Sequence, residues 1–311
     1  MTSADLWVVG RSGLLGSAVV RAASGAFAAR TVPWTDPDAA ARVLADDLDR
    51  FLAGASAEWA IVWAAGAAVI GSPASAVDRE TAVLDAFLTA VAERVDAGAT
   101  GGVFFFASSA SVYAGSEGAP FDERSEPRPL NLYGRSKLRH EALVTARLGT
   151  LIPVVLGRIS TLYGPGQNLA KQQGLVSRMA KQAASRRPIS IFVPLDTLRD
   201  YLYVDDAARM VLALLHAARR DGNPGSRVRN VVDGHAVTVG RIASLVKLVS
   251  RRRIGIWQAG TSIADGHVHD LRLATINGHE VDAVQRTPLA TGVARVYADV
   301  LGSVIGGGAP D

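Results

Sequence analysis

The stretch Val9-Gly10-Arg11-Ser12-Gly13-Leu14-Leu15-Gly16-Ser17 decides the fold of this 311-residue chain. It follows a short apolar run, residues 6–9, that has the pattern of a buried strand, and it leads into residues 17–23, which have the pattern of a helix. Glycines between a strand and a helix allow the tight turn that starts a parallel strand–helix–strand unit. The stretch therefore predicts an α/β fold that begins at this strand.

The same glycine turn is suited to a phosphate group. Gly10 permits the tight turn, Gly13 lets the backbone approach a pyrophosphate, and Gly16 lets the helix pack on the strand. The pyrophosphate would lie at the positive N-terminal end of the helix. We therefore expect a dinucleotide cofactor to be bound by Gly10, Arg11, Gly13, Leu14, Leu15 and Gly16.

Strand-like and helix-like segments alternate through the first 220 residues. Further strands are expected at 26–34, 58–65, 102–107 and 154–159, and helices at 37–52, 76–95, 132–147 and 205–219. This alternation is typical of a Rossmann doubly wound parallel sheet with helices on both faces. We expect residues 1–164 to form the dinucleotide-binding domain, with 199–220 returning to it, and 165–311 to form mostly a smaller C-terminal substrate-binding lobe.

The end of the second expected strand bears on the choice of cofactor. An acid at that position would bind the ribose 2′-OH of NAD, but Trp34 ends the expected strand and Asp36 follows two places later. Arg11 in the glycine turn and Arg30 on the strand could instead meet a 2′-phosphate. We therefore expect NADP as the cofactor, with NAD as the alternative.

Composition excludes several other classes of function. The chain is 49% apolar and 20% charged, which is ordinary for a soluble, well-packed protein. It has no cysteine and no uncharged apolar run of the roughly 18–20 residues that a membrane span needs. The net charge is +4, and the only tight basic cluster is residues 251–253. We expect a cytoplasmic protein with no nucleic-acid partner, no membrane partner and no metal, and we interpret His267 and His269 as loop residues.

A tyrosine and a lysine in Tyr133-Gly134-Arg135-Ser136-Lys137 lie one helical turn apart, on one face of an expected helix. A phenol is a poor base at neutral pH, and a nearby ammonium group makes its deprotonation easier. Ser109 and Ser111 follow the strand expected at 102–107, at the carboxyl end where parallel sheets bind ligands. These four side chains together predict proton transfer to or from a substrate oxygen.

Six segments together resemble the NAD-dependent epimerase/dehydratase family, the extended short-chain dehydrogenases/reductases that act on nucleotide sugars. In chain order the segments are 9–17, 64–66, 106–113, 133–138, 158–168 and 199–206. The resemblance extends from residue 6 to about residue 220 and fades in the part of the chain that normally selects the sugar.

The resemblance implies a role for each residue that matches a family motif. The implied catalytic set is Ser109, Tyr133 and Lys137, with Tyr133 as the acid/base and Lys137 on the nicotinamide ribose. Ala64, Ala65, Gly66 and Tyr163 would complete the cofactor site, and Ser109, Ser111, Asn168 and Arg199 would contact the substrate. Arg199 would hold the substrate diphosphate, because a guanidinium fork matches phosphate oxygens. A surface ion pair with Asp200 is the alternative for Arg199.

The implied function is an NAD(P)-dependent oxidoreductase acting on a nucleotide-diphosphate sugar, either an epimerase or a 4-ketoreductase. Ala110 and Ser111 occupy the places where the family's dehydratases carry an Asp-Glu pair, so we do not expect dehydration. A reductase of a non-sugar carbonyl and a non-catalytic NAD(P)-binding sensor or scaffold are the alternatives. The resemblance also implies a homodimer formed through the helices expected at 76–95 and 132–147.

Overall fold

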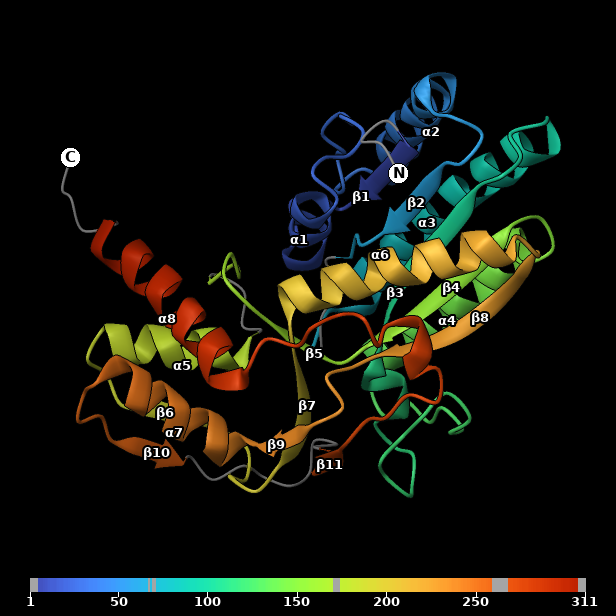
Figure 1. Ribbon diagram of the computed structural model, residues 1–311. Helices are drawn as coiled ribbons and strands as arrows, with labels where there is room; N and C mark the ends of the chain where they lie inside the picture. The colour runs from blue at the N-terminus through green and yellow to red at the C-terminus, as the bar shows by residue number, and fades with distance from the viewer. Residues whose placement is uncertain (1–4, 67, 69–70, 170–173, 259–267, 307–311) are drawn as a thin grey trace.

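The computed structural model describes residues 5–66, 68, 71–169, 174–258 and 268–306. A parallel sheet with helices on both faces occupies one side of the molecule, and a smaller lobe lies beyond the carboxyl ends of its strands (Figure 1). None of the helices in these residues is both long enough and apolar enough to cross a membrane.

The main sheet has five parallel strands in the order β1-β2-β3-β4-β8. They are β1 (Leu6–Val9), β2 (Ala60–Trp63), β3 (Val103–Ser109), β4 (Pro153–Ile159) and β8 (Gly225–Val231). The first four strands are apolar along most of their length and are almost entirely buried, as expected for a sheet covered on both faces. Because β8 joins this sheet, the chain returns to the Rossmann domain beyond residue 220.

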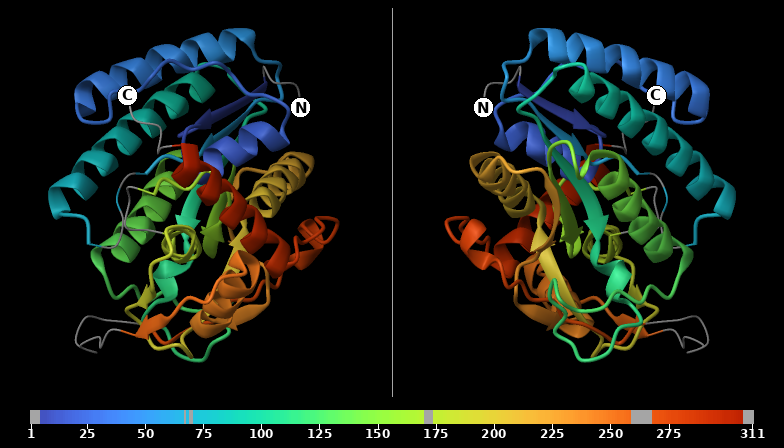
Figure 2. Two further views of the ribbon diagram at one scale, coloured as in Figure 1. Left: turned by 90° about the vertical axis from the view of Figure 1, so that its left-hand side faces the viewer. Right: turned by 90° about the vertical axis from the view of Figure 1, so that its right-hand side faces the viewer.

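Two layers of helices cover the sheet (Figure 2). Helices α1 (Leu14–Ala22) and α6 (Val204–Asp221) lie on one face, and α2 (Pro37–Gly54), α3 (Ala74–Asp96) and α4 (Leu132–Leu148) lie on the other. Successive side chains of β1 point to opposite faces, so Trp7 joins the core under α2 and α3 while Leu6 joins the core under α1 and α6.

The prediction of a strand at 26–34 is wrong, because these residues form no regular strand. The Phe27 N–H bonds the Leu6 carbonyl at 2.7 Å, but the next N–H, of Ala29, turns back to the Phe27 carbonyl at 3.0 Å. The segment is rich in alanine, and Pro33 has no N–H to give to a ladder. The other strands and helices expected in the first 220 residues are present, with their ends shifted by a few residues.

The lobe combines two small sheets with three helices. One sheet contains β5 (Thr161–Tyr163), β7 (Leu198–Tyr203), β9 (Ala236–Thr238) and β11 (Asp270–Leu271), and the other pairs β6 (Ile189–Ile191) with β10 (Ile256–Gln258). The helices are α5 (Leu175–Ala184), α7 (Val239–Ser250) and α8 (Leu289–Gly306), and they enclose a separate apolar core. Two short 3₁₀ helices, η2 (Ala110–Tyr113) and η4 (Gly278–Glu280), complete the described elements.

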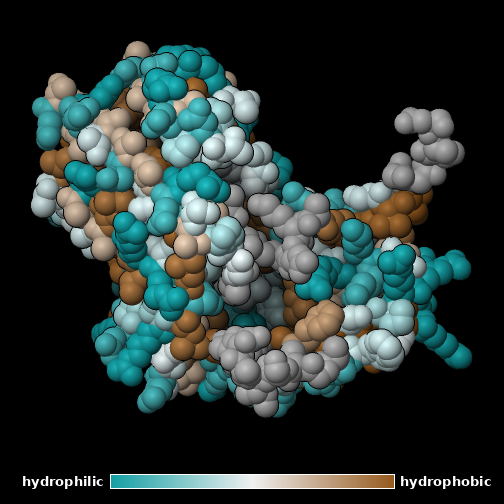
Figure 3. Space-filling view, turned by 180° about the vertical axis from the view of Figure 1, so that it is seen from behind, coloured by the Kyte–Doolittle hydropathy of each residue, from teal (hydrophilic) through white to brown (hydrophobic). Residues whose placement is uncertain are grey.

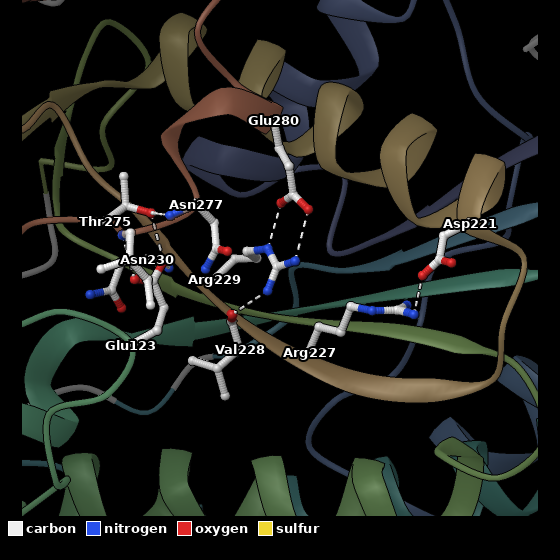
Figure 4. Close-up of polar contacts among 10 residues, drawn as sticks. Glu123, Asp221, Arg227, Val228, Arg229, Asn230, Thr275, Asn277 and Glu280 are labelled. Carbon is white, nitrogen blue, oxygen red and sulfur yellow. Dashed lines mark hydrogen bonds and ion pairs between the residues drawn. The ribbon is translucent and has the colours of Figure 1, made fainter.

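Polar contacts hold the chain after β11 against the main sheet (Figure 4). Arg229 of β8 forms a two-pronged ion pair with Glu280 of η4. Glu123 accepts the Asn230 N–H at 2.9 Å and the Thr275 hydroxyl at 2.6 Å. These contacts fix the C-terminal segment beside β8 before the chain enters α8.

Candidate active site

The glycine turn after β1 and the residues after β2 lie in contact. A Cβ atom on Gly10 would lie 2.6 Å from the Ala65 backbone nitrogen, and Gly10 has a φ of +91°, a left-handed conformation that favours glycine. A Cβ atom on Gly16 would overlap the Gly10 carbonyl oxygen. Only glycine therefore fits at both positions, and the turn packs directly on Ala64 and Ala65.

The N-terminus of α1 has the properties of a phosphate site. Its N-cap is Gly13, which provides no side-chain hydrogen bond to the first turn of the helix. The backbone N–H groups of that turn can therefore bond an anion, which the helix dipole also attracts. This arrangement fits the pyrophosphate of a dinucleotide, which Gly10 to Gly16 and Ala64 to Gly66 would hold. Arg11 is exposed at the edge of this turn.

Tyr133 and Lys137 lie together on the first two turns of α4. The Asn131 side chain caps this helix by accepting the Gly134 N–H at 2.8 Å. The Lys137 side chain is buried, and its Nζ lies 5.8 Å from the centre of the Tyr133 ring and 3.3 Å from the Ala107 carbonyl oxygen. The Lys137 ammonium therefore lies within cation–π distance of the Tyr133 ring.

Ser109 and Ser111 lie where β3 ends, against the start of α4. The Ser109 Oγ accepts the Ser111 N–H at 3.2 Å. The Ser111 Oγ is buried and has no hydrogen-bond partner among the described residues. A Cβ atom on Gly134 would lie 2.8 Å from the Ser111 carbonyl oxygen, so the lack of a side chain lets α4 approach η2. The two serines therefore lie at the same edge of the sheet as the turn that carries Tyr133.

Gly66 joins the glycine-turn half of the site to the tyrosine–lysine half. A Cβ atom there would lie 3.5 Å from Lys137 Nζ and 2.9 Å from Glu80 Oε1. The other carboxylate oxygen of Glu80 accepts the Ala68 N–H at 3.1 Å. Sequence reasoning missed Glu80, because a single acid on an amphipathic helix gives no sign that it will lie against Gly66.

The two arginines considered for a 2′-phosphate have different surroundings. Arg30 is held by Asp47 of α2, with its Nε 2.8 Å from Oδ1, and this bond raises the pKa of Arg30. Its Nη2 also donates to the Val43 carbonyl at 3.2 Å. Asp36 caps α2 by accepting the Ala39 N–H at 3.0 Å. Arg11 is thus the more available of the two candidates, and its role stays a prediction.

Arg199 is half-buried in the lobe and is bonded to backbone carbonyl groups. Its guanidinium donates to the carbonyls of Leu198 (2.7 Å), His269 (3.3 Å) and Val268. Burial lowers the pKa of Arg199. The alternative of an ion pair with Asp200 is not what the structure describes, because that carboxylate accepts the N–H groups of Asp233 and Gly234, at 3.0 and 2.7 Å.

Tyr163 and Asn168 belong to the lobe. The Tyr163 ring is buried in the lobe core, 5.6 Å from the Tyr203 ring, and burial raises its pKa. Asn168 is exposed in the loop that follows β5. The contacts described for these two residues do not join them to Tyr133 and Lys137, so their roles also stay predictions.

A buried polar network joins α4 to the strands β3 and β4. Glu141 lies one turn beyond Lys137 on α4 and pairs with Arg158 of β4, with Nη2 and Oε2 2.7 Å apart. Ser108 donates to the same carboxylate at 2.5 Å, and Arg158 Nη1 donates to the Tyr113 hydroxyl at 2.8 Å. The sequence offered a hint, since Tyr133, Lys137 and Glu141 recur every four residues.

The histidines form no metal site in the part of the chain that the structure describes, where no group of three potential ligands occurs. His269 lies 3.2 Å from Asp196, and both side chains are largely exposed. His267 lies outside the described residues.

Much of the chain matches a known protein family. Residues 6–231 match the NAD dependent epimerase/dehydratase family. An uncharacterised UDP-glucose epimerase of Bacillus subtilis is 31% identical over 154 residues, which are 48% of this chain and 45% of that protein. The chain spans about half the length or less of the curated relatives it matches.

Solved structures share the fold over nearly the whole chain. The UDP-glucose 4-epimerase of Thermotoga maritima with UDP-glucose has a TM-score of 0.77 at 20% identity, covering 96% of this chain and 99% of that one. The UDP-glucose 4-epimerase of Thermus thermophilus in complex with NAD has a TM-score of 0.74 at 17% identity, with the same coverage of both chains. The fold is therefore Rossmann-like, with a parallel sheet and flanking helices. With a match that covers well over half of its residues, the chain belongs to the NAD dependent epimerase/dehydratase family.

Proposed function

We propose that this protein is an NAD(P)-dependent oxidoreductase that acts on a nucleotide-diphosphate sugar, as an epimerase or a 4-ketoreductase. The observation that carries the proposal is the position of Lys137, whose Nζ lies 5.8 Å from the centre of the Tyr133 ring and 3.5 Å from where a Cβ atom of Gly66 would be. The relatives and structural neighbours support the substrate class, since their names specify nucleotide sugars.

Each side chain of the proposed catalytic set has its own role in the reaction. Ser109 holds the substrate oxygen by a hydrogen bond, and Tyr133 gives or takes the proton at that oxygen. The Lys137 ammonium, beside the Tyr133 ring, assists this proton transfer and would bind the ribose next to the nicotinamide. When bound, the nicotinamide supplies the hydride acceptor or donor. Ala110 and Ser111 offer no carboxylate for the elimination of water, so the proposal does not include dehydration.

Arg199 supplies the contact to the substrate diphosphate. Three backbone carbonyls fix its guanidinium, and none of the described hydrogen bonds or ion pairs joins it to a carboxylate. Its positive charge is therefore suited to an anionic group that enters from outside. A diphosphate matches that charge, whereas a neutral carbonyl compound does not, which favours the nucleotide-sugar substrate over a non-sugar one.

The family is NAD-dependent, and we propose that this member prefers NADP. Arg11 at the glycine turn would meet the 2′-phosphate, and residues 26–34, which form no strand, contain no acid that could bind a ribose 2′-OH instead. Arg30 does not share this role, because its guanidinium is bonded to Asp47 and to the Val43 carbonyl.

The proposal is tested by Tyr133→Phe. The variant keeps the ring and loses only the acid/base group, so turnover should fall by at least ~10²-fold while cofactor affinity and unfolding temperature stay unchanged. Tyr297→Phe on α8 is the matched control and should retain full turnover. A Tyr133→Phe protein with normal turnover would remove this residue from the mechanism and favour the sensor or scaffold alternative.

A further inference from the structure

Two segments of the lobe, residues 174–193 and 239–258, contain no acidic residue. The whole chain has 29 Asp and Glu, yet all of them lie outside these two segments. The segments carry nine basic residues, namely Arg178, Lys181, Arg186, Arg187, Arg241, Lys247, Arg251, Arg252 and Arg253. These two segments therefore carry a strong positive charge, although the net charge of the whole chain is only +4.

The fold gathers most of these cations at one end of the lobe. Helices α5 and α7 end at Ala184 and Ser250, and the turns that follow them are in contact. Arg252 Nη1 donates to the Ala184 carbonyl at 3.2 Å, and the Ile189 N–H donates to the Gly255 carbonyl at 3.0 Å. We call residues 181–187 and 247–253 the basic tip. The left-hand view of Figure 2 looks toward this end of the lobe.

The basic tip holds seven cations that have no acidic partner among the described residues. Five are exposed, namely Lys181, Arg186, Arg187, Arg251 and Arg253, and Lys247 and Arg252 are half-buried. None of the described ion pairs includes any of the seven, whereas arginines such as Arg30, Arg94 and Arg158 are each paired. Leu248 lies among them with 71% of its surface exposed. Hydrophilic side chains project from the outer edge of the lobe, at the right of Figure 3. The dipoles of α5 and α7 place about half a negative charge at each helix C-terminus, which offsets only a small part of the positive charge of the basic tip.

Two of the arginines occupy positions that favour glycine. Arg186 and Arg251 have φ values of +56° and +51° just past the ends of α5 and α7. Glycine is the usual residue in this left-handed conformation, because a Cβ atom makes it less favourable. The backbone therefore does not account for arginine at either position, and glycine substitutions would remove the charges without adding strain.

We propose that the basic tip is a docking surface for an anionic lipid bilayer. A bilayer attracts Lys and Arg side chains through its negative surface potential and needs no complementary groove, which suits a convex end made of helix termini and turns. Leu248, exposed among the cations, can insert at the headgroup boundary. Such docking is peripheral and needs no membrane-spanning helix, and it departs from the expectation of no membrane partner.

The experiment measures co-sedimentation of the full chain with vesicles. Wild type should bind mixed vesicles that contain equal amounts of phosphatidylglycerol and phosphatidylcholine, and this binding should weaken as the salt concentration rises. It should not bind vesicles of phosphatidylcholine alone. Each cation removed should weaken binding about fivefold, so Arg186→Gly/Arg251→Gly should bind roughly 25-fold more weakly. Its unfolding temperature should match or exceed that of wild type, which separates lost binding from lost folding.

A matched control removes two exposed arginines from the Rossmann domain. Arg42→Ala/Arg79→Ala lowers the net charge equally, at helix positions far from the basic tip, and should leave vesicle binding unchanged. Leu248→Ser should weaken binding without changing its salt dependence. The proposal is wrong if wild type ignores anionic vesicles, or if both double variants lose binding equally. It is also wrong if duplex DNA binds the tip at salt concentrations that release the vesicles. None of these readouts depends on the enzyme activity proposed above.

Discussion

Replacing Arg158 with methionine should be among the most damaging single changes to the scaffold of the candidate active site. Glu141 is only 4% exposed, and Arg158 contacts its two oxygens at 2.7, 3.1 and 3.2 Å. Without the arginine, the Ser108 hydroxyl at 2.5 Å is the only other hydrogen bond described for this carboxylate. Removing one partner of a buried ion pair leaves an uncompensated charge and costs ~3–5 kcal/mol of unfolding free energy. Glu141→Leu should cost a similar amount, because it leaves the guanidinium unpaired.

The double variant Arg158→Met/Glu141→Leu should recover most of this loss. No buried charge remains in it, and apolar side chains of similar volume replace buried ion pairs with little net cost. The remaining penalty comes from hydroxyl groups that lose a partner, Ser108 and Tyr113, at ~1–3 kcal/mol in total. The Tyr113 hydroxyl keeps its bond to Asn230 Oδ1 at 3.1 Å, which limits the damage on that side.

Guanidinium unfolding followed by circular dichroism measures all four proteins of this cycle. The double variant should be more stable than either single variant, with a coupling energy of at least ~3 kcal/mol. If the double variant instead lost the sum of the two single losses, the pair would not act as a compensated unit. The reasoning would then fail, since each side chain would stabilise the fold independently of the other.

Four further predictions follow from the site and its surroundings. Burial lowers the pKa of His140 to about 3, so the folded state keeps this imidazole neutral while the unfolded chain binds a proton below its ordinary pKa of 6.5. Unfolding free energy should therefore fall by up to ~1.4 kcal/mol per pH unit as the pH drops from 6.5 toward 3, and chemical denaturation of His140→Gln should show a flatter profile. Arg199→Ala should weaken inhibition by the free nucleoside diphosphate roughly ten- to a hundredfold and raise KM, with a smaller change in kcat; an unchanged inhibition constant would exclude Arg199 from the substrate site. Arg11→Ala should narrow the ratio of NADP to NAD affinity measured by calorimetry, and Arg30→Ala should not; equal affinities in wild type would contradict the NADP preference. A homodimer through α3 and α4 should give twice the monomer mass by light scattering at micromolar concentration, and a monomeric mass would count against it.

The two helices of the dimer prediction differ in how much apolar surface they leave exposed. Val83 and Phe87 of α3 are 2% and 1% exposed and pack on the sheet within the same chain. Leu138 and Leu143 of α4 are only partly buried. The spacing of apolar residues along a helix could not distinguish residues that pack in the core from residues left partly exposed, because a three-layer fold buries more than one stripe of a helix.

Local patterns sufficed to predict the elements near the candidate site. The glycine turn, β3 with its serines and the start of α4 each combine apolar periodicity with a characteristic polar residue in a few consecutive positions. The contacts between them needed the structure. Ser108 and Glu141 are 33 residues apart and Glu141 and Arg158 are 17 apart, so no local pattern relates them. The short strands of the lobe were also beyond a periodicity argument, because two or three residues show no period.

Because residues 26–34 form no strand, the part of the proposed cofactor site that would face the ribose 2′ group differs from the one expected. Without that strand, β1 is the edge of the sheet, and the loop between α1 and α2 lies where a strand-end acid would have stood. That loop is held by the Phe27–Leu6 backbone bond and by the ion pair of Arg30 with Asp47. Arg30 therefore positions the loop, and replacing Arg30 should weaken the binding of NAD and of NADP to the same extent. We therefore propose that discrimination between NADP and NAD rests with the glycine turn itself, where Arg11 is exposed.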